Sequence, residues 1–61
     1  MLVEITKELF NRLVPNDVPV YRIISKDDQY QMLYKVDGVI IMAVDYYLIC
    51  KTMYFVQDIN A

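Results

Sequence analysis

The chain has 61 residues, 57% of them hydrophobic and 23% charged, and carries a formal net charge of −2. This length predicts a single small domain over residues 1–61, because domains typically comprise about 50–250 residues. The chain has no His, one Cys and one Gly, which excludes a zinc finger, a disulfide scaffold, a His-dependent triad and a glycine-rich phosphate loop. We therefore expect no metal and no cofactor.

The size of the chain also predicts how its core is stabilised. For a mass of 7.3 kDa, folding should bury on the order of 6,400 Å² of surface. The apolar part of this area contributes roughly 95 kcal/mol, against roughly 90 kcal/mol for ordering the chain. Domains with so close a balance usually add a disulfide, a metal or a partner. With the first two excluded, we expect a partner.

The first residues, MLVEITKELF, place an acidic residue before any apolar run and lack a small-residue cleavage site. A secretory signal is therefore not expected, and we predict a cytoplasmic protein. Residues 39–56 are mostly apolar, but Asp45 and Lys51 interrupt them. Each of these charges costs about 2.5–3.5 kcal/mol near the centre of a bilayer, so buried strands are favoured over a membrane span.

Residues 7–14 carry apolar side chains at helical spacing, with polar side chains between them, and predict a short amphipathic helix. Thr6 is placed to cap this helix, and Glu8 favours its positive end. Pro15 ends it, because the residue before a proline disfavours the helical conformation. The chain then turns at Asn16-Asp17.

Residues 18–24 are rich in β-branched and aromatic side chains and predict a first strand, with Pro19 at an edge or near the strand's start. Residues 29–36 alternate between apolar and polar, and Asp37-Gly38 separates them from the apolar residues 39–44. This pattern predicts a tight hairpin whose second strand needs cover on both faces. The expected pairs on one side are Val36 with Val39, Tyr34 with Ile41 and Met32 with Ala43.

Residues 46–58 are too densely apolar to show a period. Their composition favours two short strands joined by a turn at Lys51-Thr52, with Asp45 at the preceding bend, and a C-terminal helix is the alternative. The expected fold class is therefore α+β. One short N-terminal helix precedes an antiparallel β-meander of four to five strands, which is either an open sheet or a small SH3-like or partly open barrel.

Few side chains suggest catalysis. Most of the six Asp residues stand where turns are expected, and Asp45 is the one that interrupts an apolar run. Asp45 marks either the end of a strand or a polar anchor in an interface. Cys50 has no His to activate it, so a buried, inert thiol is favoured over a nucleophile. We therefore expect no enzymatic activity.

Six tyrosines in so short a chain are its one unusual compositional feature. Tyr combines a flat apolar ring with a polar tip and is common at protein contacts. Tyrosines on a sheet can also stack nucleobases, so the alternative function is a small oligomer that binds single-stranded nucleic acid or a nucleotide. The six Lys and Arg residues are scattered singly, however, which disfavours nucleic acid as a partner.

The function expected from these features is a non-enzymatic protein–protein interaction module. It associates with itself and holds another protein, and its acidic charge favours a basic one. Small acidic inhibitors or adaptors, including those that phages carry, match this outline in size and charge alone. The expected self-association residues are Met32, Leu33, Tyr34, Ile41 and Met42, and the expected partner contacts are Tyr46, Tyr47 and Tyr54.

Overall fold

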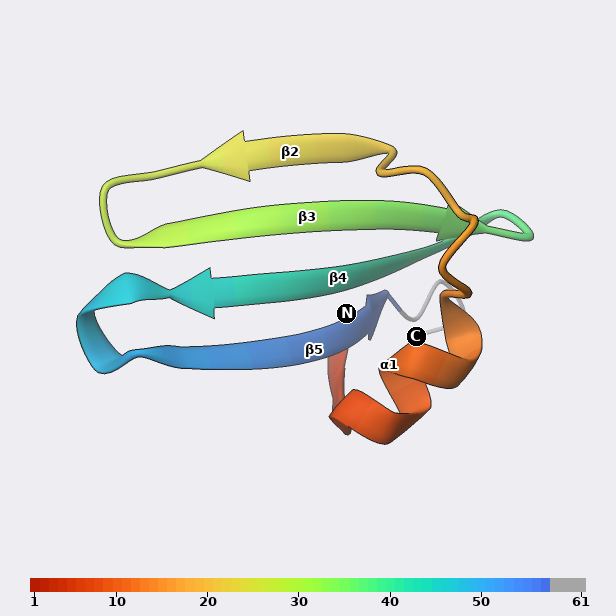
Figure 1. Ribbon diagram of the computed structural model, residues 1–61, viewed down its shortest axis with the longest axis horizontal. Helices are drawn as coiled ribbons and strands as arrows, with labels where there is room; N and C mark the ends of the chain where they lie inside the picture. The colour runs from red at the N-terminus through yellow and green to blue at the C-terminus, as the bar shows by residue number, and fades with distance from the viewer. Residues whose placement is uncertain (58–61) are drawn as a thin grey trace.

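The structure is a computed structural model and describes residues 1–57. Its five antiparallel strands form one open sheet in the order β1-β5-β4-β3-β2, with a short helix on one face (Figure 1). The α+β class is confirmed, and the sheet stays open instead of closing into a barrel. In chain order the elements are β1 (Leu2–Ile5), α1 (Lys7–Leu13), β2 (Arg22–Ser25), β3 (Gln29–Val36), β4 (Val39–Tyr46), the 3-10 helix η1 (Tyr47–Ile49) and β5 (Lys51–Gln57).

Helix α1 begins at Lys7 as predicted and ends at Leu13, one residue before the predicted end, with Val14 as its C-cap. The Leu9 N–H donates to the Thr6 hydroxyl oxygen at 3.1 Å, which satisfies one of the free donors of the first turn. The last helical residue is Leu13, and Pro15 stands two residues beyond it. Thr6 and Pro15 therefore set the two ends of the helix.

Two strands differ from the expectation. Strand β1 lies before the helix, where no strand was predicted, and pairs with β5 at the far end of the chain. Strand β2 covers Arg22–Ser25 instead of residues 18–24. Pro19 lies outside it, in a segment where the Val18 N–H donates to the Pro15 carbonyl at 3.1 Å. A proline has no N–H to donate to a ladder, so this segment forms a turn instead.

The hairpin of β3 and β4 has the predicted register: Val36 faces Val39, Tyr34 faces Ile41 and Met32 faces Ala43. Its turn consists of Asp37 at φ 51° and Gly38 at φ 80°. Positive φ at both central positions is the geometry of a type I′ turn, whose twist matches that of the flanking strands. The Asp-Gly pair thus fixes which residues of β3 and β4 face one another.

The predicted break at Lys51-Thr52 is wrong, because both residues lie in β5. The chain turns earlier, through η1 and Cys50, which adopts a left-handed conformation at φ 50°. The expected bend at Asp45 is also wrong, since Asp45 lies in β4 opposite Thr52. Cys50, expected to be buried, is exposed.

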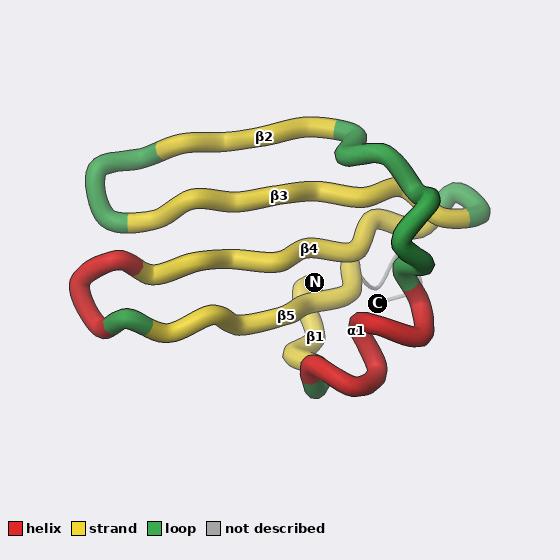
Figure 2. Tube along the Cα trace, viewed as in Figure 1, coloured by secondary structure: helices red, strands yellow, loops and turns green. Residues whose placement is uncertain are grey.

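Paired residues of an antiparallel sheet share a face, and successive residues of a strand alternate between faces. We call the face that α1 covers the helix face and the opposite one the open face. The single α-helix within residues 1–57 lies on the helix face, at the end of the sheet that also holds the β3–β4 turn (Figure 2). The short helix η1 lies at the opposite end of the sheet (Figure 2).

Burial is concentrated in the central strand β4. Ile41 on the helix face and Val44 on the open face each expose 2% of their surface. This matches the prediction that the second hairpin strand is covered on both sides. In the described chain, residues 1–57, no helix is long and apolar enough to cross a membrane.

The turn at Gly38 generates the first prediction. A Cβ added there meets no atom within 4 Å, so the cost of Gly38→Ala is the left-handed backbone alone. We expect a loss of about 1 kcal/mol in the free energy of unfolding. Gly38→Asn should lose less, because Asn tolerates this conformation. Urea titration followed by circular dichroism measures both, and an unchanged stability of Gly38→Ala contradicts the prediction.

Candidate functional site

One aromatic side chain of α1 anchors the helix to the sheet. The Phe10 ring lies edge-on to Tyr34, with ring centroids 5.7 Å apart and planes at 71°. The same ring tilts against Tyr54 at 4.6 Å and 40°. Tyr34 and Tyr54 come from β3 and β5, on either side of β4. Phe10 therefore sits above the central strand and spans its two neighbours.

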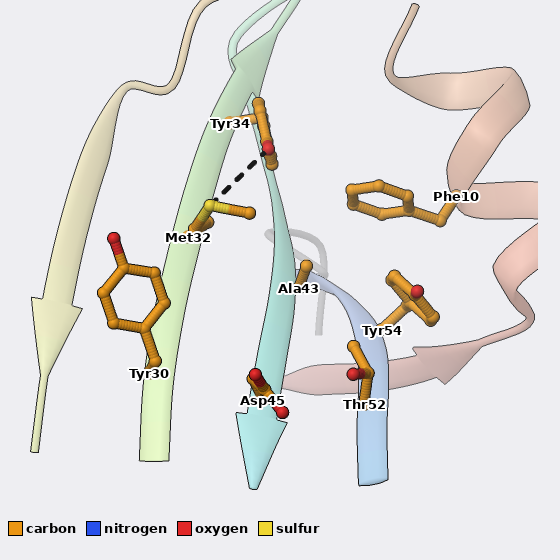
Figure 3. A pocket seen from close by; sticks show the side chains of 8 residues that line it. All are labelled: Phe10, Tyr30, Met32, Tyr34, Ala43, Asp45, Thr52 and Tyr54. Atoms are coloured by element: carbon orange, nitrogen blue, oxygen red, sulfur yellow. Dashed lines mark hydrogen bonds between the residues drawn. The ribbon is translucent and has the colours of Figure 1, made fainter. Parts of the chain in front are cut away.

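A pocket of about 340 Å³ opens beside Phe10 on the helix face (Figure 3). The rings of Phe10, Tyr34 and Tyr54 stand around Ala43, whose single methyl group leaves room between them, and the Tyr30 ring lies on the other side of Met32 (Figure 3). We call this space the aromatic pocket. Its lining consists of Phe10, Tyr30, Met32, Tyr34, Ala43, Asp45, Thr52 and Tyr54.

Asp45 is the one charged side chain that residues 1–57 contribute to this lining. It is exposed, and it lies between Tyr30 and Thr52, its partners on the two adjacent strands. Within the described chain, no hydrogen bond or ion pair engages its carboxylate. The pocket thus combines aromatic walls with a carboxylate that is open to a ligand.

The loop that follows β4 exposes a group of apolar side chains, which we call the apolar tip. Tyr47, Leu48 and Ile49 expose 43%, 83% and 65% of their surfaces. The Tyr47 N–H donates to the Asp28 carbonyl at 3.2 Å, which holds the tip against the β2–β3 turn. Adjacent exposed apolar side chains of this size are typical of interaction sites.

A row of side chains crosses the open face through the paired positions of all five strands. Leu33, Met42 and Phe55 form its apolar centre. Arg22 stands beside Leu33 on one edge strand, and Glu4 stands beside Phe55 on the other. We call this set the open-face row. It has a cation at one end, apolar groups in the middle and a carboxylate at the other end.

The structure distributes the predicted site residues over both faces. Of the expected self-association set, Met32, Tyr34 and Ile41 lie on the helix face, whereas Leu33 and Met42 lie on the open face.

The expected partner contacts are also dispersed. Tyr54 contacts Phe10, Tyr46 is half-buried on the open face, and Tyr47 begins the apolar tip.

Sequence reasoning missed Phe10 and Tyr30 as members of one site. Both carried a signal, since Phe10 lies on the apolar side of its helix and Tyr30 alternates with Met32 and Tyr34. Their meeting depends on where α1 packs, which is a contact between segments far apart in the chain.

No protein-family model, curated protein or solved structure matches this chain. The function is therefore argued from the geometry. Among the side chains that the structure describes, no three His, Cys, Asp or Glu residues are grouped to hold a metal ion. The features available for function are the aromatic pocket, the apolar tip and the open-face row.

The position of Phe10 generates a second prediction. Phe10→Ala removes both ring contacts that hold α1, and we expect a loss of about 2–4 kcal/mol in the free energy of unfolding. Leu9→Ala is the matched control, because Leu9 is the adjacent helical residue and is 40% exposed. It should cost about 1 kcal/mol or less. Chemical denaturation measures both, and equal losses would show that Phe10 does not anchor the helix.

Proposed function

We propose that this protein is a non-enzymatic interaction module that associates with itself through the open face and holds a basic protein with the helix face. The observation that carries the proposal is that the sheet has more apolar surface than its one α-helix covers. The sheet is apolar on both faces, whereas the single α-helix of residues 1–57 lies on one of them. A partner that covers the remaining apolar surface lowers the free energy of the assembly.

The open-face row supports self-association because it is complementary to itself. In a symmetric dimer the same patch of both copies meets across a two-fold axis. If this axis is parallel to the strands, the open-face rows of the two copies lie antiparallel to each other. Arg22 of each copy then lies near Glu4 of the other, and the half-buried side chains of Leu33 and Phe55 meet at the centre, above the buried Met42. An apolar centre with a charged rim is the usual anatomy of a protein interface.

The helix face supports a second, basic partner. Its pocket presents Asp45 among aromatic rings, and the neighbouring β2–β3 turn adds Asp27 and Asp28. Acidic groups next to exposed apolar side chains attract and then retain a basic protein surface. By size and charge, the protein is then a candidate small acidic inhibitor or adaptor.

The arrangement favours a protein partner over nucleic acid. Tyr30, Tyr34 and Tyr54 lie on the helix face, where the pocket carries Asp45. The open face instead carries Arg22, Lys35 and Lys51, which are paired with Leu33, Ile40 and Tyr46. A binder of single strands needs aromatic rings and cations on the same surface. Here the aromatic cluster lies on the face opposite these cations. The rings that do lie beside the cations are dispersed: Tyr46 pairs with Lys51, and the Lys35 Nζ lies 5.4 Å from the Tyr21 ring centroid.

The self-association is tested by reversing charges in the open-face row. Arg22→Glu places like charges together at two symmetric positions, so the dissociation constant of the dimer should rise on the order of tenfold. Adding Glu4→Arg to the same chain should restore the affinity. Sedimentation velocity over a range of concentrations measures the dissociation constant. All of the altered side chains are exposed, so the fold should be preserved.

Lys26→Glu is the matched control, because Lys26 is an exposed cation that follows β2 and lies outside the row. It should leave the dissociation constant unchanged. A wild-type chain that sediments as a monomer at every concentration would overturn the proposed self-association. Equal effects of Lys26→Glu and Arg22→Glu would show that the open-face row is not the contact.

The preference against nucleic acid gives a separate prediction. A fluorescently labelled oligo-dT should show no change in anisotropy with the protein at low salt, because the cluster of rings on the helix face carries Asp45 in place of cations. Binding that weakens steeply as salt is added would instead favour the nucleic-acid alternative.

A further inference from the structure

The aromatic pocket has the composition of a site for an organic cation. The π-faces of aromatic rings carry partial negative charge and attract a cation within about 6 Å of the ring centre. Phe10, Tyr30, Tyr34 and Tyr54 contribute four rings to one pocket of about 340 Å³. Figure 3 shows the rings of Phe10, Tyr34 and Tyr54 around the space above Ala43, and the Tyr30 ring on the other side of Met32. Residues 1–57 place no Lys or Arg side chain in this lining, so the described chain supplies no cation of its own.

Asp45 supplies a full negative charge at one end of this pocket, away from Tyr34 (Figure 3). A carboxylate can accept two parallel N–H donors from a guanidinium group, which is among the strongest charged hydrogen-bond arrangements in proteins. Its neighbour Thr52 adds a hydroxyl oxygen as a further acceptor. The aromatic walls therefore favour a cation, and Asp45 at the end of the pocket favours a cation with two parallel N–H donors.

These features select an arginine side chain over the other cations of proteins. A guanidinium is planar, stacks on aromatic rings and is weakly hydrated, whereas a lysine ammonium is compact and strongly hydrated. The aliphatic stem of arginine also matches Met32 and Ala43, the apolar residues between the rings. A lysine ammonium cannot donate two parallel N–H bonds to the Asp45 carboxylate as a guanidinium can.

The apolar tip indicates that the arginine belongs to a protein chain. Tyr47 follows directly after the last residue of β4, two positions beyond Asp45, and begins the exposed segment that includes Leu48 and Ile49. A free guanidinium compound would occupy the pocket alone. An arginine flanked by apolar residues would fill the pocket and also cover Leu48.

We infer that the aromatic pocket binds the arginine side chain of a basic partner protein, with the guanidinium on Asp45 and flanking apolar residues on the apolar tip. The inference rests on the proposed function and specifies which chemistry of the partner the helix face recognises. It does not depend on self-association, because the open-face row lies on the opposite side of the sheet.

The test is a titration of the full chain with the peptide acetyl-Ala-Leu-Arg-Leu-Ala-amide, followed by ¹⁵N–¹H NMR. We expect shift changes at Tyr30, Asp45, Leu48 and Tyr54. Asp45→Asn should weaken binding about tenfold, because it removes a charge-assisted pair. Tyr30→Leu keeps an apolar side chain but removes one ring, and it should weaken binding about two- to fivefold.

Three controls separate binding in the pocket from nonspecific charge attraction and from nonspecific apolar contact. Asp17→Asn removes the same charge from an exposed turn that follows α1, outside the pocket lining, and should leave the affinity unchanged. A peptide with citrulline in place of Arg keeps the shape without the charge and should bind about tenfold more weakly. Free N-acetyl-arginine-amide should shift the pocket residues but not Leu48.

Three results would overturn the inference: no shift with the Arg peptide, equal binding of the citrulline peptide, or equal losses in Asp45→Asn and Asp17→Asn. Sedimentation of the same samples reports self-association independently. A chain that forms dimers and ignores the peptide would refute the arginine site alone. A chain that binds the peptide as a monomer would refute the self-association and leave the arginine site standing.

Discussion

Strand β4 must be covered on both of its faces, and the rest of the structure follows from that constraint. Its residues Ile41 through Val44 are all apolar and all buried, so neither face can be left to water. Hydrogen bonds to β3 and β5 place it at the centre of the sheet, where side chains of the adjacent strands shield it. Within residues 1–57 the buried apolar side chains are these four and Val14, so the core is small, and large apolar side chains such as Leu48 stay exposed.

The short helix explains why the pocket exists. Helix α1 has seven residues, so it covers one end of the helix face and reaches β4 through Phe10. Phe10 fills the space above Tyr34 and Tyr54, and beyond it the small side chain of Ala43 leaves a hollow. A helix two turns longer would be about 11 Å longer and could close this hollow. The chain instead leaves aromatic rings facing open space.

Signals that act over a few residues predict this fold well. Thr6 and Pro15 set the ends of α1, and Asp37-Gly38 sets the hairpin and its register, because each acts through its own backbone or side-chain geometry. Strand β1 was missed because its evidence is its pairing with β5, about fifty residues away in the chain. The turn at η1 was missed because it is built from apolar residues and a left-handed Cys50, without the usual Gly or Asn. The pocket depends on both local and long-range signals. Tyr30 and Tyr34 alternate along β3, which the sequence shows, whereas Phe10 joins them only because α1 packs on the sheet.

Both proposed contact surfaces depend on the register of a single hairpin. Ala43 and Asp45 of β4 belong to the aromatic pocket, while Met42, between Ala43 and Ile41, belongs to the open-face row. A slip of one residue between paired strands exchanges the faces of every side chain. Such a slip would move Asp45 away from the tyrosines and place Met42 among them. The two-residue turn at Asp37-Gly38 prevents this slip, because its positive φ angles fit one pairing of Val36 with Val39. The turn geometry that sets the hairpin register therefore also keeps the aromatic pocket and the open-face row on opposite faces of the sheet.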